Sequence, residues 1–100
     1  MIIRLSETTI VTVGELAILT CQVSGNPDPS VTWTKDGHAS IPRAHFQNNG
    51  SLLAIQGVIP GDEGVYQCKA SNVFGESQTA TSLVVGGKYY KVQVTEEDLV

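Results

Sequence analysis

The chain has 100 residues and a mass of 10.7 kDa; 41% of the residues are hydrophobic and 16% are charged, which fits one globular domain rather than a disordered segment. Its formal net charge is −4, and its six Lys and Arg are spread thinly, which excludes a basic surface for nucleic acid or anionic lipid. No hydrophobic run approaches the ~20 residues of a membrane-spanning helix, so we also expect no direct membrane insertion.

β-Branched residues and short alternating patterns recur between turn residues along the chain, which is typical of an all-β sandwich. Gly, Pro, Asn and Asp cluster between the alternating segments, where they supply the backbone angles that turns require. We therefore predict strands over residues 2–5, 9–13, 16–23, 30–35, 43–47, 51–56, 64–71 and 77–85.

The pattern changes after the last of these strands. Gly86-Gly87 is expected to form a hinge, residues 88–95 alternate again, and the following residues are acidic. We assign residues 1–86 to one domain and 87–100 to a C-terminal extension or linker. This extension is an extra edge strand, the first strand of a following domain, or a passive tail.

The two cysteines, Cys21 and Cys68, fall in predicted strands far apart in the sequence, and Trp33 follows the first of them. A crosslink between them would enclose ~45 residues and stabilise the fold by roughly 3–4 kcal/mol, because it restricts the unfolded chain. The indole of Trp33 would cover the sulfurs from the facing sheet. Tyr66 follows Asp62 at the spacing of a tyrosine corner, in which the phenol bonds to backbone a few residues upstream.

From about residue 14 to residue 85 the sequence resembles the intermediate set (I-set) of the immunoglobulin superfamily. The segments that carry the resemblance are Gly14-Glu15, Gly25-Asn26-Pro27-Asp28-Pro29, Val31-Thr32-Trp33, Lys35-Asp36-Gly37, Leu53-Ala54-Ile55, Asp62-Glu63-Gly64-Val65-Tyr66-Gln67-Cys68, Ala70-Ser71-Asn72-Val73-Phe74-Gly75 and Leu83-Val84-Val85.

This resemblance implies an immunoglobulin-like Greek-key β-sandwich of two antiparallel sheets, ABED and A′GFC. It implies a disulfide between Cys21 and Cys68, a structural core around Trp33, Tyr66 and Asp62, and an ion pair between Arg43 and Asp62. Alternation then predicts which side chains point inward. They are Ala17, Leu19, Cys21, Val23, Val31, Trp33, Leu53, Ile55, Tyr66, Cys68, Leu83 and Val85.

The same alternation places four apolar residues on the outside of strands B and E: Leu16, Ile18, Leu52 and Ala54. The family usually has small polar residues there, so these four are a candidate interface for homodimerisation. The alternative is ordinary scattered surface hydrophobics. Phe74, in the turn over residues 72–75, is a further interface candidate; its alternative role is that of a packed turn residue.

Asn49-Gly50-Ser51 satisfies the acceptor rule for N-glycosylation, which makes Asn49 a candidate glycosylation site. Asn-Gly is also a frequent two-residue hairpin turn, so the Asn and Gly are explained without a sugar.

The chain offers no pattern for catalysis or metal binding. His38 and His45 are expected at the surface, and no third or fourth ligand joins them. Both cysteines are assigned to the crosslink, and no serine has a nearby His and carboxylate. We therefore predict no enzyme activity, no metal and no cofactor.

We predict a non-enzymatic interaction and spacer module of a multidomain cell-surface or extracellular-matrix protein, whose partners are other proteins and neighbouring immunoglobulin domains. The alternative is an intracellular structural domain of a cytoskeletal or muscle filament protein, with both cysteines reduced. The N-terminal residues 1–4 are too short for a signal sequence, so the chain is either cytosolic or part of a longer protein.

Overall fold

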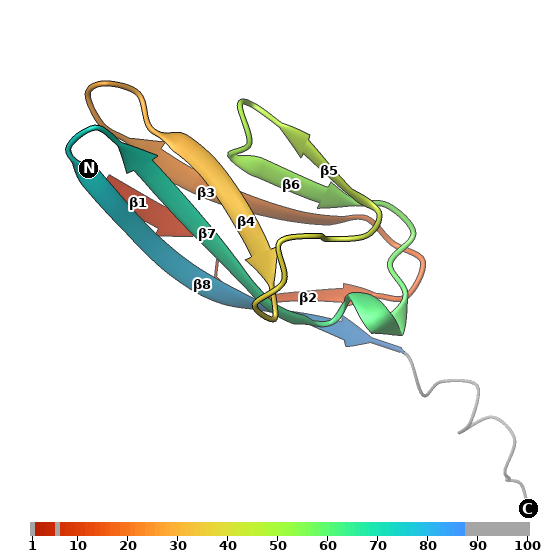
Figure 1. The fold of residues 1–100 in the computed structure, drawn as a ribbon. Helices are drawn as coiled ribbons and strands as arrows, with labels where there is room; N and C mark the ends of the chain where they lie inside the picture. The colour runs from red at the N-terminus through yellow and green to blue at the C-terminus, as the bar shows by residue number, and fades with distance from the viewer. Residues whose placement is uncertain (1, 6, 88–100) are drawn as a thin grey trace, which may run out of the picture.

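The computed structural model describes residues 2–5 and 7–87 and shows two four-stranded sheets packed face to face (Figure 1). In the first sheet the order is β1 (Ile2–Leu5), β3 (Ala17–Ser24), β6 (Leu52–Ile55) and β5 (Ala44–Gln47). In the second sheet the order is β2 (Thr9–Thr12), β8 (Gly75–Gly86), β7 (Gly64–Asn72) and β4 (Ser30–Lys35). A short 3₁₀ helix, η1 (Pro60–Asp62), precedes β7.

The predicted all-β sandwich is confirmed, and every predicted strand is found within two residues of its expected bounds. One pairing differs from the expected antiparallel sheets: β2 runs parallel to β8, with Thr9 beside Leu83. The chain crosses from the first sheet to the second between β1 and β2: β1 pairs with β3, and β2 pairs with β8. No tight turn joins β2 to β8, so the antiparallel geometry of a hairpin is not imposed on them. The predicted extension lies outside the described residues from residue 88 onward.

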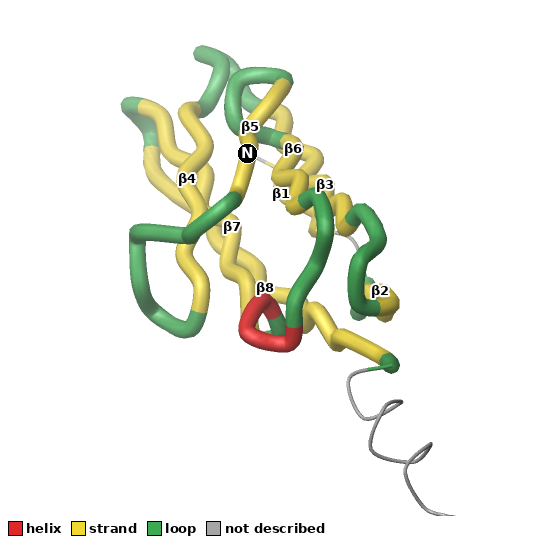
Figure 2. Tube along the Cα trace, turned by 90° about the vertical axis from the view of Figure 1, so that its right-hand side faces the viewer, coloured by secondary structure: helices red, strands yellow, loops and turns green. Residues whose placement is uncertain are grey.

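The two sheets form two layers (Figure 2). The core between them follows the predicted alternation. Of the twelve predicted inward residues, Val23 and Val31 are half-buried and the others are buried. Cys21 on β3 and Cys68 on β7 form a disulfide across the core, with Cα atoms 6.4 Å apart. The indole of Trp33 was expected to face both sulfurs from the opposite sheet. Instead, Trp33 and Cys68 are paired neighbours in the second sheet, and only Cys21 belongs to the sheet opposite Trp33. Its Nε1 donates to Gly50 O at 2.6 Å.

A polar cluster closes the end of the sandwich near η1. The Tyr66 hydroxyl donates to Asp62 O at 2.6 Å, which is the predicted tyrosine corner. The Asp62 carboxylate accepts from Ile59 N at 2.9 Å and forms the expected ion pair with Arg43. Arg43 also donates to Gln56 O at 3.0 Å and to Gly57 O. Because Asp62 is buried, these bonds compensate for the loss of water around its charge.

Candidate functional site

Three connections gather at one end of the sandwich, opposite the end where β8 leaves it (Figure 1). They are the β3–β4 loop over residues 25–29, the β5–β6 turn over residues 48–51 and the β7–β8 turn over residues 72–75. Loops held by a rigid sandwich are common sites of recognition, which makes this end of the domain a candidate binding surface.

The β7–β8 turn presents two apolar side chains to solvent. Val73 is 81% exposed and Phe74 is 82% exposed, more than any other large hydrophobic residue that the structure describes. The exposure of Phe74 excludes its alternative role as a packed turn residue. We call Val73 and Phe74 the apolar tip.

Asn72 holds the apolar tip in place. Its Oδ1 accepts from Phe74 N at 2.9 Å, and its Nδ2 donates to Pro27 O on the neighbouring loop, also at 2.9 Å. A shallow hollow of about 250 Å³ lies beside the tip, with the polar side chains of Asn26, Glu76 and Ser77 in its lining. The surface is therefore an apolar projection next to polar groups, and the backbone that carries it is held in place by these hydrogen bonds. Such an arrangement lowers the entropic cost of binding.

Three of the four apolar residues predicted on the outside of the first sheet share a face, and Leu16 immediately precedes β3. Ile18 pairs with Ala54, and Thr20 pairs with Leu52. Leu16 is 52% exposed and Ile18 is 46% exposed, whereas Leu52 and Ala54 are half-buried. We call these four residues the outer B/E patch. Its role in self-association stays a prediction.

A third apolar area, which was not predicted from the sequence, lies on the outside of the second sheet. Ile10 and Val84 are neighbours on β2 and β8, and Val65 lies on the same face of β7. All three are exposed, Ile10 to 73%. Alternation contained this information, because each of these residues is next in sequence to a buried one: Val11, Tyr66 and Val85.

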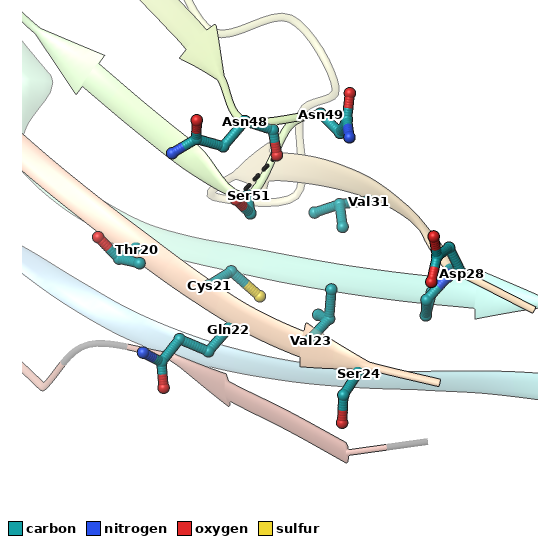
Figure 3. A pocket seen from close by; sticks show the side chains of 11 residues that line it. Thr20, Cys21, Gln22, Val23, Ser24, Asp28, Val31, Asn48, Asn49 and Ser51 are labelled. Atoms are coloured by element: carbon teal, nitrogen blue, oxygen red, sulfur yellow. Dashed lines mark hydrogen bonds between the residues drawn. The ribbon is translucent and has the colours of Figure 1, made fainter. Parts of the chain in front are cut away.

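The β5–β6 turn is one residue longer than the three residues, 48–50, left between the predicted strands. Gln47 and Leu52 are the last paired residues, so the turn has four residues. Asn48, Asn49 and Gly50 have positive φ angles of 53°, 58° and 89°. Asn and Gly tolerate this left-handed conformation better than other residues, which explains the sequence locally. The turn borders a hollow of about 480 Å³ that also touches β3 and the β3–β4 loop (Figure 3).

Within the described ranges the structure brings together no group of three His, Cys, Asp or Glu residues that could hold a metal. His38 and His45 are exposed, as expected. In the same part of the chain, no helix is long and apolar enough to span a bilayer. Burial raises the pKa of Tyr66 from 10.0 to about 12, and the negative charges of Asp62 and Asp36 add to this rise while Arg43 opposes it. This phenol is a buried hydrogen-bond donor that holds the corner together.

The family model described as "Immunoglobulin I-set domain" matches residues 1–85. The human Netrin receptor DCC is 50% identical over 66 residues, which is 65% of this chain but only 5% of that receptor. Sidekick-1 immunoglobulin domains 1–4 superpose with a TM-score of 0.74 at 36% identity, covering 81% of this chain and 22% of that one. The titin M3 domain superposes with a TM-score of 0.73 at 25% identity, covering 83% and 95% respectively.

Proposed function

Since this chain belongs to the immunoglobulin I-set domain family, we propose that it is a non-enzymatic interaction and spacer module of a multidomain cell-surface or matrix protein. The stiff, disulfide-linked sandwich sets the distance between neighbouring domains, and the apolar tip contacts a partner protein. Weak contacts of single domains are then multiplied by repetition along the parent chain.

The observation that carries this proposal is the exposure of Val73 and Phe74 on a turn that Asn72 fixes on both sides. An exposed aromatic residue on a turn whose backbone is held by hydrogen bonds resembles the anchors that dominate protein interfaces. The similarity to the Netrin receptor DCC and to Sidekick-1 supports the same kind of role.

Replacing both tip residues, Val73→Ser and Phe74→Ser, is expected to weaken partner binding by at least ~30-fold, because removal of an interface anchor costs ~2 kcal/mol or more. The folding stability should stay nearly unchanged, since neither side chain is buried. The probe is a fluorescent tetramer of the disulfide-linked domain, titrated onto cultured cells with and without prior surface proteolysis.

The matched control is Ile10→Ser, which also removes an exposed apolar side chain but lies on β2. It should bind like the wild type. Equal binding of the wild type and the tip variant, or binding that survives proteolysis of the cell surface, would rule out the tip as a protein-binding anchor.

The similarity to the titin M3 domain favours a second candidate function, that of an intracellular structural domain in a filament. The disulfide argues against it, because such bonds are rare in reducing compartments. Counting thiols on the native protein without reductant separates the two candidates: two free thiols would support the filament role, and none would support the extracellular role.

The outer B/E patch leads to a separate prediction about self-association. If two copies pair through this face, the wild type should sediment as a concentration-dependent dimer, and the variant Leu16→Ser with Leu52→Ser should sediment as a monomer. Thr32→Ser, on the opposite sheet, serves as the control and should behave like the wild type. A wild type that stays monomeric at high concentration excludes homodimerisation through the patch.

A further inference from the structure

We propose that Asn49 carries an N-linked glycan that covers the hollow beside the β5–β6 turn. Asn49-Gly50-Ser51 is the sole Asn-x-Ser/Thr sequence in the 100 residues. The proposal rests on the proposed extracellular role, because this modification takes place only in the secretory pathway.

The folded turn leaves Asn49 free to carry a sugar. The residue is exposed, and its carboxamide makes no hydrogen bond or ion pair among the residues that the structure describes. In Figure 3 Asn49 lies across the hollow from β3, at the rim of the hollow that it lines. A sugar on its Nδ2 therefore breaks no bond and displaces no packed group.

Asn72 shows what an asparagine with a structural role looks like in this chain. Both ends of its carboxamide are used, by Pro27 O and by Phe74 N. The neighbouring Asn48 has the same left-handed backbone as Asn49 but does not begin an acceptor sequence. The turn conformation accounts for an Asn at position 49 but not for its unused carboxamide.

The Ser51 hydroxyl donates to Asn48 O at 2.9 Å in the folded turn. Since the sugar is transferred to the chain before this turn is complete, the hydroxyl is still available when the transferase reads the sequence. Asn49 Nδ2 then attacks C1 of an oligosaccharide linked to a lipid pyrophosphate. The N–C1 bond forms, the C1–O bond to the pyrophosphate breaks, the lipid pyrophosphate leaves, and one amide proton passes to a base of the transferase.

The hollow next to Asn49 has a volume of about 480 Å³, and its lining combines hydroxyl and amide groups with the half-buried Val23 and Val31. This mixture suits the polar edges and apolar face of a pyranose. Its far side is formed by Asp28 and Pro29 of the loop that also supports the apolar tip through Pro27. A glycan here closes the hollow to protein partners and leaves the tip at the same end of the domain open.

The experiment expresses the full chain behind a heterologous signal sequence in mammalian cells and measures the intact mass of the secreted protein. We expect most of the wild type and of Ser51→Thr to carry an increment that peptide N-glycosidase removes, leaving Asp at position 49. Ser51→Ala and Asn49→Asp should lose the increment, and Asn48→Gln should keep it. Secreted protein with an intact disulfide but no increment overturns the glycan while the proposed function stands. Secretion failure of the wild type, with the same chain folded and carrying two free thiols in the cytosol, overturns both.

Discussion

Reduction of the Cys21–Cys68 bond is expected to lower the free energy of unfolding by ~4 kcal/mol. The cysteines are 47 residues apart, and the entropy that a crosslink of this length removes from the unfolded chain corresponds to about that value. A domain of this size has a total stability of ~5–15 kcal/mol, so the loss is a large fraction of it. Urea unfolding of the oxidised and the reduced protein, followed by Trp33 fluorescence, measures the difference directly.

The variant Cys21→Ala with Cys68→Ala is the matched control, because the reductant has no bond to break in it. Its stability should be close to that of the reduced wild type, lowered further by the small cavities that the missing sulfurs leave in the core. A reductant effect below ~1 kcal/mol on the wild type would contradict the entropic account. It would also make a reduced, intracellular form of this domain more plausible, because such a form has to stay folded without the bond.

The sandwich could be predicted from the sequence because its determinants are local or strongly patterned. Alternation placed Leu19, Leu53 and Leu83 in the core, and all three are fully buried. The spacing of Tyr66 and Asp62 predicted the hydrogen bond at 2.6 Å, since the tyrosine corner is formed within five residues of one segment. Strand pairing across the two sheets came from the family resemblance rather than from the pattern itself.

The candidate surfaces could be predicted only in part, because exposure at a turn depends on contacts between distant segments. Phe74 could not be called exposed from the sequence: its position depends on Asn72 reaching Pro27, 45 residues away. The predicted strands left residues 48–50 for the turn after β5, whereas the observed turn has the four residues 48–51. Asn48, Asn49 and Gly50 all lie in the left-handed region. Because Asn48, Asn49 and Gly50 all tolerate the left-handed conformation, the local sequence is compatible with turns of different lengths. The pairing register of β5 with β6 determines which of these lengths is adopted.

Raising the pH above 10 is expected to destabilise the domain through Tyr66. Burial first, and then the charges of Asp62 and Asp36, raise the pKa of this phenol to about 12 in the folded state, whereas the unfolded chain titrates near 10.0. Below pH 10 both states keep the proton, so the stabilising contribution is complete. Between pH 10 and 12 the unfolded chain ionises while the folded one does not, and the free energy of unfolding falls by ~1.4 kcal/mol per pH unit, or ~3 kcal/mol in total.

The comparison that isolates this effect is Tyr66→Phe, measured by urea unfolding at pH 8, 10, 11 and 12. At pH 8 the variant should be less stable by ~1–2 kcal/mol, because it lacks the hydrogen bond to Asp62 O and leaves a buried carbonyl without its donor. The wild type should lose this advantage as the pH rises and be the less stable protein by pH 12. Tyr89, Tyr90 and the lysines are present in both proteins, so their titration cancels in the difference. Parallel stability profiles of the two proteins would mean that the Tyr66 phenol ionises as easily in the folded domain as in water, and that its bond to Asp62 does not lock the corner.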